Sequence, residues 1–91
     1  MIEYYYIDLD GILCEETKPY AKCKPIIRNI NKVNKLFDEN KKIIIWTARR
    51  LRDKKLTIKW LKENNVKFDG IHLGKPKFTK YIDEREKLIG W

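Results

Sequence analysis

Apolar residues along the chain follow two different spacings, and each change of spacing marks the boundary of an expected element. Residues 3–9 form an aromatic, β-prone run, and residues 43–46 are continuously apolar, as in a strand that is covered on both faces. Between these runs, apolar residues recur at steps of three and four from residue 26 to about residue 39, directly after Pro25. This spacing predicts an amphipathic helix, and a second helix is expected over residues 53–64.

The remaining segments are shorter or irregular. Residues 12–24 lack a periodic pattern and are expected to form a loop or a short flap. In the last third of the chain we expect brief strands over residues 66–68 and 71–73, a strand over residues 78–82, and a terminal helix near residues 84–89. Strands and helices therefore alternate along the whole sequence.

This alternation predicts an α/β fold, namely a small, Rossmann-like, three-layer domain with a mainly parallel sheet. Residues 1–91 are expected to form a single domain, because no linker, repeat or low-complexity segment divides them. Right-handed crossovers would bring the carboxyl ends of the parallel strands to one edge, where open α/β sheets bind ligands.

The net charge of the chain narrows the class of binding partner only in part. Lys and Arg number 21 against 13 Asp and Glu, which gives a net charge of +8 and favours an anionic partner such as nucleic acid or a phosphorylated small molecule. Sixteen of the 21 cations are lysines spread over the whole chain, a bias that AT-rich codon usage also produces. The charge alone therefore leaves a nucleic-acid surface and a compositional bias as alternatives.

Composition also narrows the location and the kinds of metal site. No apolar run approaches the ~20 residues that a membrane span needs, and the N-terminus lacks a secretory pattern, so we expect a cytoplasmic protein with no membrane partner. Cys14 and Cys23 are separated by eight residues, and the chain has one histidine, so a zinc site is not expected. Free thiols are the expected state of the two cysteines, with a disulfide as the alternative.

A pair of carboxylates, Asp8 and Asp10, marks the end of the first predicted strand. Side chains two residues apart on a strand point to the same side, so both carboxylates are expected to face one spot. Two carboxylates this close repel each other unless a cation lies between them or one keeps its proton. Gly11 then lets the backbone turn away from the site. The alternative is that this DLDG segment is only a solvated turn, since Asp and Gly are common in turns.

Further polar residues follow the other predicted strands. Thr47 ends the apolar strand, where its hydroxyl and the adjacent backbone N–H can hold a phosphate oxygen. Lys75 lies in a tight Gly-Lys-Pro loop, which is an unusual place for a surface lysine. Asp83 and Glu84 follow the predicted fourth strand and, together with Asp8, offer enough carboxylate oxygens for Mg²⁺.

Four motifs in this order, DLDG, IIIWTAR, GKP and YIDER, resemble those of the haloacid dehalogenase-like (HAD) phosphatase superfamily. The resemblance is strongest with its small, capless members, including the capsular-polysaccharide-biosynthesis phosphatases, and it spans residues 4–85. It implies an HAD-like fold without a cap domain, since the segments between the predicted elements are too short to hold one.

The resemblance also implies an activity, that of a Mg²⁺-dependent phosphomonoester hydrolase with an aspartyl-phosphate intermediate. Asp8 would be the nucleophile and Asp10 the general acid and base. Thr47 would hold the transferring phosphoryl group, and Lys75 would neutralise its charge. The residues expected to contact phosphate or substrate are Gly11, Thr47, Ala48, Arg49 and Lys75.

The metal site implied by the resemblance consists of Asp8, Asp10 through its backbone carbonyl, and Asp83. Glu84 stands where close relatives often have a second Asp, so its part in metal binding is an open alternative. A catalytically weak, phosphate-binding HAD-like domain is therefore the second hypothesis. A phospho-accepting receiver domain fits worse, because receivers place their acidic pair side by side.

An uncapped site would be open to solvent, which bears on its partners. It would accept a bulky substrate such as a phosphorylated saccharide or a nucleic-acid end, or it would be covered by a second subunit in a homo-oligomer. A phosphorylated small molecule is the simplest anion that explains the basic charge.

Overall fold

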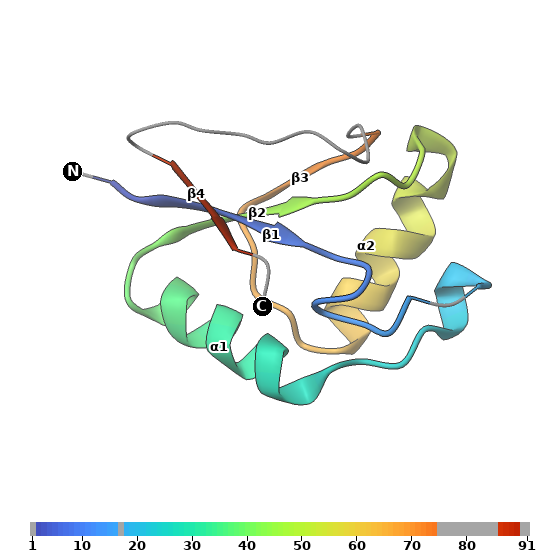
Figure 1. Ribbon diagram of the computed structural model, residues 1–91, viewed down its shortest axis with the longest axis horizontal. Coiled ribbons are helices and arrows are strands. Elements are labelled where there is room, and N and C mark those ends of the chain that lie inside the picture. The colour runs from blue at the N-terminus through green and yellow to red at the C-terminus, as the bar shows by residue number, and fades with distance from the viewer. Residues whose placement is uncertain (1, 17, 75–85, 90–91) are drawn as a thin grey trace.

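The computed structural model describes residues 2–16, 18–74 and 86–89. Its centre is a four-stranded sheet in the order β3-β2-β1-β4, in which every pair of neighbouring strands is parallel (Figure 1). The α/β architecture and the mainly parallel sheet that the sequence predicts are therefore confirmed. The strands are β1 (Tyr4–Asp8), β2 (Lys42–Trp46), β3 (Gly70–His72) and β4 (Glu86–Ile89).

Two helices connect the first three strands. Helix α1 (Ile27–Asp38) lies between β1 and β2 in the chain, and α2 (Lys54–Glu63) lies between β2 and β3. Both differ by only one residue at each end from the helices that the apolar spacing predicts. The expected loop after β1 contains one short 3-10 helix, η1 (Tyr20–Lys22), and a second, η2 (Leu51–Asp53), precedes α2.

Both helices lie on the same side of the sheet (Figure 1). Alternate residues of β1 and β2 point into this layer, where Ile7, Ile43 and Ile45 are fully buried and Tyr5 is partly buried. Within the described part of the chain, helices cover this face alone. The main residues of the shared core are Ile7, Leu9, Ile30, Val33, Ile43, Ile45, Trp60 and Leu61.

The opposite face of the sheet carries an aromatic group. The rings of Tyr6 and Trp46, from neighbouring strands, meet edge to face with centroids 5.6 Å apart. Tyr6 also meets His72 of β3 at 6.1 Å. Since β3 is at one edge of the described sheet and His72 is exposed, His72 is an edge residue.

Two predicted elements are wrong, and one lies outside the described residues. Residues 66–68 are not a strand, because Val66 instead folds back onto the end of α2, where its N–H donates to the Leu61 carbonyl at 2.9 Å. The helix expected near residues 84–89 is also wrong, since Glu86–Ile89 forms β4. A helix of this length gains little from its own hydrogen bonds, whereas pairing with the free edge of β1 satisfies the backbone groups of both strands. The strand expected over residues 78–82 lies outside the described residues.

Two further expectations concern membrane helices and the state of the thiols. Among the described residues, no helix is long and apolar enough to cross a membrane. Cys14 and Cys23 are both buried free thiols, as the sequence favours.

Candidate active site

The carboxyl ends of β1 and β2 lie side by side at one edge of the sheet. Asp8 is the last residue of β1 and pairs in register with Trp46, the last residue of β2. Thr47 follows immediately, and its backbone N–H donates to the His72 carbonyl at 2.9 Å, which continues the pairing toward β3. The structure therefore places Asp8 and Thr47 at the ends of adjacent strands, at the edge of the sheet where the sequence predicts the site.

The turn after β1 brings Asp10 to the same edge. β1 ends at Asp8, so the alternation of a strand does not set the direction of Asp10, contrary to our expectation for the pair. Gly11 has a positive φ of 92°, and its N–H donates to the Cys14 carbonyl at 2.7 Å, which closes the turn. A left-handed backbone at this position favours glycine, because a side chain would strain it.

A buried arginine sets the direction of the Asp10 carboxylate. Arg49 Nη2 donates to Asp10 Oδ1 at 2.7 Å, and Arg49 Nε donates to Asp10 Oδ2 at 3.1 Å. The side chain of Arg49 is 0% exposed, while that of Asp10 is 19% exposed. Two parallel hydrogen bonds of this kind fix both distance and orientation, so Arg49 holds Asp10 in place without shielding it completely from solvent.

The other N–H groups of Arg49 are also occupied. Nη1 donates to the hydroxyl of Thr57 on α2 at 3.1 Å, and Nη2 lies 3.5 Å from the sulfur of Cys23. The ring of Tyr20 lies over the guanidinium carbon, with its centroid 4.1 Å away. We name this group the Arg49 cluster; its members are Asp10, Cys14, Tyr20, Cys23, Arg49 and Thr57.

The electrostatics of the cluster keep the arginine charged and the neighbouring thiol neutral. Burial acts to lower the pKa of Arg49, but the hydrogen bonds with Asp10 and Cys23 outweigh it, so the pKa of Arg49 is raised. Burial is also the main reason why the pKa of the Cys14 thiol is raised far above its ordinary value. The cluster is therefore built around one ion pair, with Cys14 as a protonated neighbour.

Arg49 is placed differently from our expectation of a phosphate contact. Its guanidinium is fully buried and directed at Asp10 and Thr57, because the nearest carboxylate satisfies its charge inside the fold. Sequence reasoning also missed Thr57 as a partner. A signal was present, since Thr57 is a polar residue on the same buried stripe of α2 as Trp60 and Leu61.

The loop after β2 provides polar groups beside Asp8. The Thr47 hydroxyl accepts a hydrogen bond from the Arg49 N–H at 3.1 Å and retains its own proton for donation. The Thr47 N–H is used in the sheet, whereas the Ala48 N–H has no acceptor within the described part of the chain. Of the donors expected here, the Thr47 hydroxyl and the Ala48 N–H have no acceptor among the described residues, although Thr47 itself is only 2% exposed.

Three predicted site residues, Lys75, Asp83 and Glu84, lie outside the described residues. Strand β4 begins at Glu86, after both acidic residues, so the strand expected to precede them is not β4. Over residues 2–16, 18–74 and 86–89, no group of three or more Asp, Glu, His or Cys side chains could hold a metal.

Part of the expected metal site is nevertheless described. The Asp8 carboxylate and the Asp10 backbone carbonyl lie at the same edge, and this carbonyl accepts no hydrogen bond from any described residue. Mg²⁺ prefers such hard oxygens and completes its shell with waters and substrate phosphate. The described residues therefore fit the cation as a partial ligand set.

Comparisons with known proteins support the fold and leave the substrate open. No protein-family model and no curated protein matches the chain. A Vibrio cholerae protein solved as an MCSG target is 26% identical, with a TM-score of 0.75 over 90% of this chain and 80% of that one. A chain of the Pnkp1/Rnl/Hen1 RNA repair complex is 14% identical, with a TM-score of 0.73 over 96% of this chain.

A phosphatase is also among the similar structures. The cobalt-bound deoxy-D-mannose-octulosonate 8-phosphate phosphatase of Haemophilus influenzae is 20% identical, with a TM-score of 0.59 over 81% of this chain. Our chain spans 43% of that phosphatase and 34% of the RNA-repair chain. The similarities confirm the Rossmann-like α/β fold that the sequence predicts.

Proposed function

We propose that this protein is a Mg²⁺-dependent phosphomonoester hydrolase in which Asp8 is the nucleophile. The observation that carries the proposal is the position of Asp8 beside Thr47 at the ends of two adjacent parallel strands, with Asp10 held next to them by Arg49. The fold is also that of a known phosphatase, which supports this class of reaction. In this proposal the nucleophile, a hydrogen-bond donor to the phosphate and the proton carrier all lie at one sheet edge.

The reaction would take place in two displacements. A carboxylate oxygen of Asp8 attacks phosphorus, and the bond from phosphorus to the leaving oxygen breaks while Asp10 gives that oxygen a proton. Asp10 then takes a proton from a water molecule, whose oxygen attacks the aspartyl-phosphate. The phosphorus–oxygen bond to Asp8 breaks, and inorganic phosphate is released.

The surrounding residues would serve charge and orientation. The Thr47 hydroxyl and the Ala48 N–H would donate to the phosphoryl oxygens, and Lys75 would neutralise their charge. Asp8, the carbonyl of Asp10 and Asp83 would hold Mg²⁺, with Glu84 as a further candidate ligand. When bound, the cation would withdraw charge from the phosphoryl oxygens.

The site would be open to large substrates. Within the described residues, the segment between β1 and α1 contains only η1, and the segment between β2 and β3 contains only η2 and α2. Neither includes a cap domain, so a phosphorylated saccharide, as in capsular-polysaccharide biosynthesis, or a nucleic-acid end would fit. A cytoplasmic location and a homo-oligomer that covers the site are further parts of the proposal.

Hydrolysis of a panel of phosphate esters, with Mg²⁺ and with chelator, tests the proposal. We expect activity that chelator removes, and we expect Asp8→Asn to abolish turnover because an amide is a poor nucleophile. The matched control is Asp38→Asn, which removes one carboxylate from the far end of α1, where the side chain is 59% exposed. Near-wild-type activity in Asp8→Asn would overturn the assignment, whereas phosphate binding without hydrolysis in the wild type would favour the phosphate-binding domain.

A further inference from the structure

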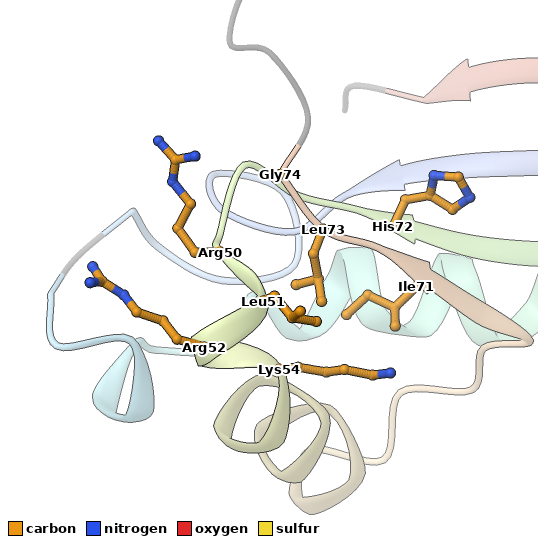
Figure 2. Close-up of a pocket in the computed structure, with 8 residues that line it drawn as sticks. All are labelled: Arg50, Leu51, Arg52, Lys54, Ile71, His72, Leu73 and Gly74. Carbon is orange, nitrogen blue, oxygen red and sulfur yellow. The ribbon is translucent and has the colours of Figure 1, made fainter.

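A basic pocket lies next to the candidate site, between the loop after β2 and the end of β3 (Figure 2). It has a volume of about 1010 Å³ and is open to solvent. Arg50 and Arg52 extend from one side of the loop, and Lys54 extends from the start of α2. Three cationic side chains thus come from five consecutive residues.

The other part of the lining is apolar. Leu51 points toward Ile71 and Leu73 of the facing segment (Figure 2). Leu51 is 75% exposed, which is high for a large apolar side chain and leaves it free to contact a ligand. The lining therefore contains both cations and apolar side chains, with Lys54 on the same side of the loop as Leu51 and with Arg50 and Arg52 on the other side (Figure 2).

The pocket has a fixed position relative to Asp8. The Gly74 N–H donates to the Arg49 carbonyl at 2.8 Å, which joins the end of the β3 segment to the loop after β2. Asp8, Trp46 and His72 are in register on β1, β2 and β3, so the backbone of His72, which lines the pocket, lies about 10 Å from that of Asp8, or two strand spacings. A group bound there belongs to the part of the substrate beyond the phosphate that reacts.

The chemistry of the lining selects among anions. No acidic side chain lines the pocket within the described part of the chain, and Asp53, which lies between Arg52 and Lys54 in sequence, forms an ion pair with Arg52 at 3.8 Å. Apart from His72, no uncharged side chain there could hydrogen-bond sugar hydroxyls. Cations beside an apolar surface suit a chain that carries both phosphates and flat bases.

We propose that this pocket binds the phosphates and bases of a single-stranded nucleic acid whose terminal phosphate enters the site at Asp8. This inference rests on the proposed function and names its substrate class. Arg50, Arg52 and Lys54 contact internal phosphates, and Leu51 packs against a base. The preference for a nucleic-acid end over a phosphorylated saccharide then follows from the loop between β2 and α2.

The test uses short single-stranded oligothymidylates with a phosphate at the 5′ or the 3′ end, and p-nitrophenyl phosphate as a substrate too small to reach the pocket. The variant is Arg50→Ala/Arg52→Ala, and the charge-matched control is Lys59→Ala/Lys62→Ala, which changes two exposed residues farther along α2. Binding is followed by fluorescence anisotropy during a salt titration, so that it does not depend on turnover. Hydrolysis is followed by phosphate release.

We expect the arginine variant to bind the oligonucleotide more weakly and to raise its KM, while p-nitrophenyl phosphate is hydrolysed as in the wild type. The slope of log K against log salt should become shallower by about 1.4, which corresponds to two phosphate contacts on a single strand. The control should keep the wild-type slope.

Three outcomes would overturn the inference: an unchanged slope in the arginine variant, an equal change in the control, or a preference for glucose 1-phosphate over both oligonucleotides. Each of these leaves the proposed function standing when p-nitrophenyl phosphate is hydrolysed. Absence of hydrolysis of every ester by the wild type would instead contradict the proposed function, and with it the substrate class.

Discussion

Replacing Arg49 with methionine should destabilise the protein by about 3–4 kcal/mol. The change leaves the Asp10 carboxylate without its partner, and breaking a buried pair in this way costs about 3–5 kcal/mol. Because the Asp10 side chain is 19% exposed, the lower end of that range applies. Loss of the contact with the Tyr20 ring, 4.1 Å from the guanidinium carbon, adds about 0.5–1 kcal/mol.

The variant should still fold, so the loss can be measured. A chain of 91 residues typically has a free energy of unfolding of about 5–14 kcal/mol. Urea unfolding at neutral pH, followed by tryptophan fluorescence, gives the difference, since Trp60 is buried and donates to the Cys23 carbonyl at 2.9 Å. Arg28→Met is the matched control, and as an exposed residue of α1 it should change stability by no more than about 0.5 kcal/mol.

A double-mutant cycle with Asp10→Asn separates the ion pair from general packing. Asp10→Asn alone should cost about as much as Arg49→Met, because it leaves the buried guanidinium without its carboxylate. The double variant has neither charge, so its loss of stability should be smaller than the sum of the two single losses by about 2–3 kcal/mol. Costs that add to within about 0.5 kcal/mol would refute the reasoning, since Asp10 and Arg49 would then be energetically independent.

Three further predictions follow from single contacts and conformations. Above about pH 8.5 the unfolded chain releases the thiol proton of Cys14 while the folded chain keeps it, because burial raises the pKa of this thiol. The free energy of unfolding should therefore fall by up to about 1.4 kcal/mol per pH unit in that range, and Cys14→Ala should remove this part of the pH dependence. Equal pH dependence in the wild type and in Cys14→Ala, measured by urea unfolding, would contradict the prediction. Asn29→Ala should destabilise the protein by about 1–3 kcal/mol, because the buried Asn29 amide donates to the Ile12 carbonyl at 2.8 Å. Thermal unfolding measures the loss, with Asn31→Ala at an exposed position as the control. Equal effects of the two substitutions would contradict a stabilising role for the Asn29 hydrogen bond. Gly11→Ala should cost about 1–2 kcal/mol from backbone strain alone, since φ is 92° and no described residue other than its two chain neighbours lies within 4 Å of the added methyl. An unchanged midpoint of thermal unfolding would show that the turn tolerates a side chain.

The elements that the sequence predicts well are those whose secondary structure is determined by the pattern of apolar residues within the element itself. α1, β2 and α2 differ from the predicted ranges by one residue or less at each end, because a sustained apolar period sets which face each must bury. The positions of Asp8 and Thr47 at neighbouring strand ends follow from the same reasoning, since parallel strands end at one edge. The site could be located to this extent from the sequence.

The features that the sequence did not predict depend on distant partners. Glu86–Ile89 becomes a strand because β1 offers an edge to pair with, and nothing within the segment itself indicates this. The direction of Arg49 depends on Asp10, 39 positions earlier, and on Thr57 in the next helix. Such contacts are fixed by the tertiary arrangement, and a spacing rule within one element cannot supply them.

Under the proposed function, the Arg49 cluster would orient Asp10, the proposed proton carrier. A cap domain can position catalytic groups by closing over them, and the described residues include none. Here the segment after β1 folds inward instead: Tyr20 covers the guanidinium, and the Cys23 carbonyl is held by Trp60 of α2. The guanidinium in turn fixes the Asp10 carboxylate from behind, where substrate does not need to pass. An inward anchor of this kind would not itself block the sheet edge, which is what the proposed long phosphorylated substrate would require.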